Sequence, residues 1–127
     1  MTSSDPRRQL LLELFQAGLT RVEGRRCTGA ALRAAAWRPL RVWTAAVGKA
    51  ASAMALGAYD VLGAAQQRLL LITKDGHVAP EARALPGAEF HESAHPLPDA
   101  RSIVAGQRLL RFTQELPHDV EPLFLIS

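Results

Sequence analysis

The chain has 127 residues, of which 48% are hydrophobic, and a formal net charge of +3. This length suits one domain with a sizeable core, and no apolar stretch approaches the ~18 residues that a membrane span needs. A single cysteine, Cys27, excludes an internal disulfide framework, and a cytoplasmic location is expected. The basic residues are scattered and the aromatic content of 6% is thin for base stacking, so no nucleic-acid partner and no membrane partner are expected.

The N-terminal half predicts three helices and one strand. Residues 6–22 place apolar side chains at helical spacing, and Glu13 interrupts the apolar run, which favours an amphipathic helix over a signal peptide. An alanine-rich segment, 28–36, predicts a short helix, and Pro39 separates it from a strand at 41–47. A helix over 49–63 follows, and its small residues permit close packing against a sheet.

The C-terminal half continues the alternation of strands and helices. The predicted elements are a strand at 68–73, a loop at 74–87, a more polar strand near an edge at 88–93, a helix at 100–116 capped by Asp99, and a strand at 121–126. Such alternation predicts an α/β fold with a mainly parallel, Rossmann-like sheet and helices on both of its faces.

The chain stops at the last residue of a predicted strand. A buried parallel strand normally runs into a turn and a further helix, so residues 1–127 are expected to be the N-terminal α/β domain of a larger protein, incomplete at its C-terminus. The alternative is a complete small domain whose final strand is covered by the preceding helices.

Residues whose side chains could bind a ligand or take part in catalysis follow the predicted strands. Ligands of open parallel sheets bind beyond the carboxyl ends of the strands. The candidates there are Gly48, Lys49, Lys74, His77, His95, Asp99 and Ser127. Lys49 and Lys74 are the only lysines among fifteen basic residues, and both follow apolar runs. A compact ammonium serves as a point charge for phosphate, so their placement indicates an anion site.

Each candidate also has a plain structural interpretation. Gly48 could serve a tight turn, Lys49 could extend into water, and Asp99 is better explained as a helix cap than as a catalytic acid. His77, His91 and His95 lack the spacing of a metal site, and no metal ligands are assigned. The sequence contains neither a P-loop nor a dinucleotide fingerprint.

Four segments together resemble one known family. The stretches AAVGKAASAMALGAYDVL, LLLITKDGH, ESAHPLPDA and the terminal LFLIS, in this order and spacing, are similar to the N-terminal region of the glycerate 2-kinase family. These are the MOFRL-type kinases, some of which also carry the older name hydroxypyruvate reductase. The resemblance covers nearly the whole chain.

The resemblance implies a two-domain kinase that transfers a phosphoryl group from ATP to the 2-hydroxyl of D-glycerate, with a divalent metal, Mg²⁺ being expected. Lys49 matches the family's lysine in GKA, which is implicated in catalysis, and Lys74, His77, His95 and Asp99 match patterned positions. The family continues after Ser127 into a Gly- and Ser-rich loop, so independent kinase activity of this chain is not expected.

Two other functions remain open on the sequence alone. The first is a non-catalytic α/β domain that binds a small anion or a partner. The second is an oxidoreductase acting on hydroxypyruvate, which the missing dinucleotide fingerprint weakens. The sequence does not indicate an oligomeric state.

Overall fold

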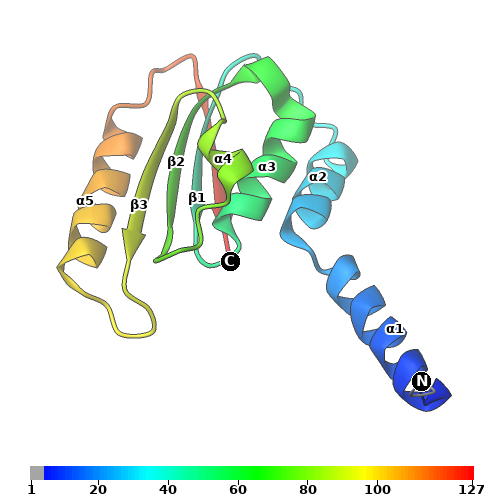
Figure 1. The fold of residues 1–127 in the computed structure, drawn as a ribbon. Coiled ribbons are helices and arrows are strands. Elements are labelled where there is room, and N and C mark those ends of the chain that lie inside the picture. Colours follow the sequence, from blue (N-terminus) through cyan, green and yellow to red (C-terminus); the bar gives the residue numbers. More distant parts are fainter. Residues whose placement is uncertain (1–4) are drawn as a thin grey trace.

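A computed structural model describes residues 5–127, and Figure 1 shows them as a sheet between two layers of helices, with one further helix outside. The elements in chain order are α1 (Pro6–Arg21), α2 (Gly24–Ala34), β1 (Val42–Val47), α3 (Ala51–Leu62), a short 3₁₀ turn (Gly63–Ala65), β2 (Gln66–Lys74), α4 (Pro80–Arg83), β3 (Ala88–Ser93), α5 (Ala100–Gln114) and β4 (Glu121–Ile126).

The four strands form one sheet in the order β3-β2-β1-β4, and every pairing is parallel. The central strands β1 and β2 are the most apolar and the most buried, because helices cover them on both faces. The prediction of a parallel α/β sheet is confirmed, and β3 lies at an edge as its polar sequence indicated.

Helices α2, α3 and α4 cover one face of the sheet, and α5 covers part of the other (Figure 1). The first core joins α3 alanines to the leucines of β2, whereas the second joins Phe112 of α5 to Trp43 and Leu70. Ala105 and Phe112 are the buried residues of α5. The helical layers on both faces are therefore confirmed.

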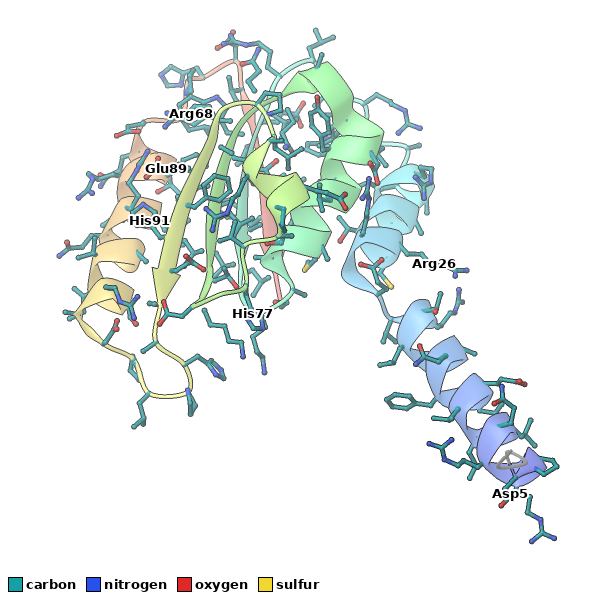
Figure 2. The ribbon with its side chains drawn as sticks, in the orientation of Figure 1. Asp5, Arg26, Arg68, His77, Glu89 and His91 are labelled. Atoms are coloured by element: carbon teal, nitrogen blue, oxygen red, sulfur yellow. The ribbon has the colours of Figure 1, made fainter. Side chains whose placement is uncertain are left out.

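A charged cluster fastens α5 to the edge of the sheet. Glu89 on β3 accepts hydrogen bonds from Arg108 Nε at 2.6 Å and from His91 Nε2 at 2.9 Å, and Arg68 lies beside it (Figure 2). Burial raises the pKa of Glu89, but the hydrogen bonds from Arg108 and His91 outweigh this effect and leave the pKa below its usual range. Arg68 also stacks 4.3 Å from the centre of the Trp43 ring.

One predicted helix start and one predicted loop were wrong. The second helix begins at Gly24 rather than at residue 28, because Glu23 caps it by accepting hydrogen bonds from the backbone N–H groups of Arg25 and Arg26. The predicted loop 74–87 contains the one-turn helix α4. Pro80 occupies the first position of this helix, where proline is favoured, and Ala82 is buried in the first core.

Helix α1 forms as predicted, but its apolar face packs on nothing within residues 5–127. None of its residues is buried, and it points away from the sheet and the other helices (Figure 1). Its large apolar side chains from Leu10 to Val22 are between 41% and 72% exposed. Helical spacing identified the helix correctly, but spacing alone says nothing about which surface covers it.

Candidate functional site

A pocket of about 180 Å³ opens at the carboxyl ends of β1, β2 and β3. Each strand contributes its last residues, and the loops after β1 and β3 contribute their first residues. The lining residues are Val47, Gly48, Lys49, Ile72, Thr73, Lys74, Ser93, Ala94 and His95. Four of the seven candidates from the sequence, Gly48, Lys49, Lys74 and His95, therefore meet in one cavity, at the edge where parallel sheets bind ligands.

Gly48 and Ser127 shape the turn between β1 and α3. Gly48 adopts a φ of 117°, which side chains other than hydrogen rarely tolerate, and a Cβ atom there would overlap the Oγ and carbonyl oxygen of Ser127. The N–H of Ser127 donates to the carbonyl of Val47 at 3.0 Å, and its Oγ accepts from the N–H of Ala50 at 3.0 Å. Ser127 therefore holds the turn that carries Lys49, although it does not line the pocket itself.

The two lysines reach the pocket from the turn after β1 and from the last position of β2. Lys49 is exposed and precedes the first turn of α3, whereas Lys74 is half-buried at the end of β2. Neither forms an ion pair with a carboxylate among residues 5–127. This part of the pocket is consequently positive and uncompensated, and the start of α3 adds a partial positive charge of its own.

The remaining candidates lie near this edge but serve the protein's own structure. His77 lies at the carboxyl edge, exposed (Figure 2). Its Nδ1 is 3.2 Å from the carbonyl oxygen of Asp75, and its own carbonyl accepts from Ser52 Oγ at 2.9 Å. Asp99 caps α5 by accepting from the N–H of Arg101, within a capping box completed by Ser102. The capping interpretation of Asp99 is confirmed, while a ligand-binding role for His77 or Asp99 stays a prediction.

Arg101 neutralises two carboxylates beside the site. It donates to both oxygens of Asp75, at 2.6 and 2.8 Å, and to Asp99 at 2.9 Å. These hydrogen bonds lower the pKa of Asp75 and of Asp99, so both are held as carboxylates. Sequence reasoning missed Arg101, because nothing local indicated that the loop after β2 would meet the start of α5.

Thr73 is a second residue that sequence reasoning missed. It lines the pocket and is 4% exposed, and its hydroxyl oxygen is buried with no hydrogen-bond partner among the described residues. A buried polar atom without a partner is uncommon and costs about 1–3 kcal/mol. Its sequence signal was weak, since a threonine inside a β-strand is ordinary.

The described residues do not gather metal ligands. Within residues 5–127, no group of three or more His, Cys, Asp and Glu side chains could hold a metal ion. Two carboxylates beside this edge, Asp75 and Asp99, are already engaged by Arg101. Across the same residues, no helix has both the length and the apolar character needed to cross a bilayer.

Comparison with known proteins connects this geometry with one family. The profile of the family described as "Domain of unknown function (DUF4147)" matches residues 10–127. Over 87 residues the chain is 38% identical to the D-glycerate 2-kinase of Thermotoga maritima. The aligned segment covers 68% of this chain and 20% of that protein. The crystal structure of a glycerate kinase from the same organism superposes with a TM-score of 0.77 at 31% identity, covering 91% of this chain and 27% of that one.

The match in sequence and the match in structure agree, and the resemblance to glycerate 2-kinases is confirmed. The chain spans about a fifth to a quarter of the length of these two relatives. Because the profile covers all but the first nine residues, this chain belongs to the DUF4147 family.

Proposed function

We propose that the pocket at the carboxyl edge of the sheet binds a small anion, and that the chain provides the corresponding part of a glycerate 2-kinase. The single observation that carries the proposal is the meeting of Lys49 and Lys74, both without a carboxylate partner among the described residues, in one pocket beside the start of α3. A pocket of about 180 Å³ suits a phosphoryl group or a three-carbon acid, since whole drug-sized ligands occupy roughly 300–1,000 Å³.

The proposed reaction is phosphoryl transfer from ATP to D-glycerate. The 2-hydroxyl oxygen forms a bond to the γ-phosphorus, the bond to the β-phosphate oxygen breaks, ADP leaves, and the hydroxyl proton is released. Such transfer depends mostly on positioning and on neutralising charge. Lys49 and Lys74 would hold the anionic groups, and Lys49 is the residue that we expect to neutralise charge during transfer.

The fit to the expected Mg²⁺ differs from the fit to an anion. The unpaired lysines and the unpartnered Thr73 hydroxyl fit an anion, whereas residues 5–127 offer no carboxylate cluster for a divalent cation. A metal that accompanies ATP would therefore take its ligands from phosphates, water or other protein groups, as Mg²⁺ commonly does. None of the roles proposed for the lysines depends on it.

Binding to the purified chain tests the pocket directly. Titration with D-glycerate, ATP and inorganic phosphate should show a saturable site for at least one of them. Lys49→Ala and Lys74→Ala should each weaken that binding at least tenfold, or about 1.4 kcal/mol. Arg26→Ala is the matched control, because Arg26 is exposed and lies away from the carboxyl edge (Figure 2), and it should change nothing. If all three variants weaken binding equally, the general positive charge of the protein attracts the anion and the pocket does not bind it specifically.

Catalysis requires a separate test in the setting of a complete relative. A chimera of the Thermotoga maritima enzyme that carries residues 10–127 in place of its own counterpart should phosphorylate D-glycerate. Lys49→Ala in that chimera should lower the rate about 10²–10³-fold, as loss of one transition-state donor typically does. Lys49→Arg should also be impaired, because a planar fork does not replace a compact ammonium. If the Lys49→Ala chimera keeps a rate within a few-fold of the parent chimera and an unchanged melting temperature, Lys49 has no part in catalysis.

A further inference from the structure

Arg101, the second residue of α5, joins two loops that border the candidate pocket. Its guanidinium donates to both carboxylate oxygens of Asp75 at 2.6 and 2.8 Å, and its Nε donates to Asp99 at 2.9 Å. Asp75 directly follows Lys74, which lines the pocket. Asp99 ends the loop after β3, in which His95 also lines the pocket. One arginine therefore engages a carboxylate on each of two loops beside the pocket.

The backbone holds Asp75 at the margin of the pocket. Its N–H donates to the carbonyl oxygen of Ser93 at 3.1 Å, and Ser93 is a lining residue. The N–H of Gly76 donates to Glu92 Oε1 at 2.9 Å, and Glu92 has a cation of its own in Arg83, 4.0 Å away. The Asp75 carboxylate therefore stays beside the pocket whether or not Arg101 engages it.

The charged side chains that meet at this edge leave one net positive charge. The cations are Lys49, Lys74 and Arg101, and the anions are Asp75 and Asp99. The hydrogen bonds from Arg101 lower the pKa of both aspartates, so both are charged at neutral pH. Without the guanidinium the count falls to zero. Two carboxylates would then be free beside two lysines that form no ion pair among residues 5–127.

We propose that Arg101 is a positioning residue of the anion pocket, which keeps the two aspartates away from the two lysines and so leaves both ammonium groups available to the anion. The inference rests on the proposed anion-binding function and adds to it a residue outside the pocket lining. An ammonium group paired with a carboxylate of its own protein attracts an anion less, because the two opposite charges largely cancel. A guanidinium suits this task, since its planar fork takes both oxygens of one carboxylate and still reaches a second.

A purely structural role for Arg101 makes a different prediction. The side chains of Arg101 and Asp75 are 52% and 55% exposed, and exposed ion pairs contribute little to stability. If their contact only braced the two loops, removal of either partner would do the same damage to the pocket. If Arg101 shields the lysines, its removal frees carboxylates and weakens anion binding, whereas neutralising Asp75 frees none and leaves Arg101 on Asp99.

Binding of inorganic phosphate and of D-glycerate to the purified chain tests this in about 0.1 M salt, where the screening length is ~10 Å. Arg101→Gln should weaken binding about three- to fivefold. Asp75→Asn should bind at least as tightly as wild type. The double variant should return to within about twofold of wild type, because the edge regains its net positive charge. The loss in Arg101→Gln should shrink in about 1 M salt, where the screening length is ~3 Å.

Arg111→Gln is the matched control. It removes the same charge from the same helix, about 15 Å further along, and Arg111 is exposed and forms no ion pair within the described chain. It should change the affinity less than twofold. If Asp75→Asn weakens binding as much as Arg101→Gln does, or if the double variant stays as weak as Arg101→Gln, the contact is a brace and the inference is overturned.

The reactivity of the lysines decides the inference without any anion. Lys49 and Lys74 are the only lysines of the chain, so their acylation by an N-hydroxysuccinimide ester can be followed separately by mass spectrometry, with the α-amino group as the internal reference. Arg101→Gln should slow at least one lysine about twofold, because an ammonium held by a carboxylate reacts more slowly, and Asp75→Asn should slow neither.

The two measurements distinguish failure of the inference from failure of the proposed function. Unchanged lysine reactivity in Arg101→Gln would overturn the shielding role, whatever the anion affinity of the wild-type chain. A wild-type chain that binds neither phosphate nor D-glycerate would overturn the proposed function, while slower lysines in Arg101→Gln would still support shielding by Arg101.

Discussion

At the scale of single residues, the candidate site depends on unpaired charge and on one unusual backbone conformation. Thirteen of the fifteen basic residues are arginines, and several of these are engaged in ion pairs that hold elements together. The two lysines are not, and the fold brings both to the same pocket. The fold could have paired each lysine with a carboxylate of the same protein. Because both ammonium groups are left unpaired among the described residues, at the edge where parallel sheets bind ligands, we expect an anion there.

Substitution of Gly48 should damage stability and the pocket together. Gly48→Ala would place a Cβ atom against Ser127 at a φ of 117°, so we expect a loss of at least about 1–3 kcal/mol in the free energy of unfolding, measured in urea. Anion binding should weaken too, because the turn that carries Lys49 must shift.

Gly76→Ala is the comparison for Gly48→Ala. Gly76 also has a positive φ, 74°, but a Cβ atom there would meet nothing within 4 Å. It should therefore cost only the roughly 1–2 kcal/mol of the left-handed conformation. If Gly48→Ala is no worse than Gly76→Ala, the contact with Ser127 does not constrain the turn.

At the scale of elements, helices α2 and α3 pack closely against each other. A Cβ atom on Gly57 of α3 would overlap the backbone carbonyl of Arg25 in α2. The Arg25 side chain then spans the same junction, donating to both oxygens of Asp60 and to Glu81 of α4. The absence of a side chain at one position thus allows three helices to be tied by one guanidinium.

Two glycine-to-alanine substitutions should therefore have opposite signs. Gly57→Ala should destabilise the protein by about 1–3 kcal/mol, because an added methyl group in a tight contact forces the backbones apart. Gly106→Ala, in α5, meets nothing within 4 Å and should stabilise by about 0.5–1 kcal/mol through helix propensity. Chemical denaturation of both variants checks this, and stabilisation by Gly57→Ala would mean that the α2–α3 contact is looser than described.

At the scale of the whole molecule, α1 is separable from the rest of the described fold. The sheet and its helical layers enclose two hydrophobic cores, and α1 contributes to neither. The helix ends where the chain turns at Val22 into α2, and its stability as a helix owes little to the body of the protein. Its apolar side chains therefore remain exposed within residues 5–127.

Deletion of residues 1–22 should leave the stability of the monomer nearly unchanged. Because α1 has no buried residue, we expect the free energy of unfolding at low concentration to stay within about 0.5 kcal/mol of wild type. Chemical denaturation of the full and the shortened chain measures this difference, and a large loss of stability in the shortened chain would show that α1 supports the cores.

The sequence by itself determined the class of fold, the order of the elements other than the one-turn helix α4, and the edge of the sheet at which the candidate site lies. Runs of apolar residues predicted β1, β2 and β4 to within two residues of their ends, and Asp99 predicted the start of α5, which it caps. These features arise from interactions within a few residues, so local patterns carry them. The resemblance to glycerate 2-kinases also rested on short motifs and is confirmed by the comparisons.

The tertiary structure alone decided which distant residues meet. It placed Lys49 and Lys74 in one pocket, paired Arg101 with Asp75 and set Ser127 against Gly48. Among residues 5–127 it also left the apolar face of α1 uncovered. The same helical spacing that buries Phe112 in α5 leaves Phe15 in water, because burial depends on what other segments bring to a surface. Periodicity specifies a helix and its apolar side, whereas its partner is chosen by packing between segments far apart in the chain.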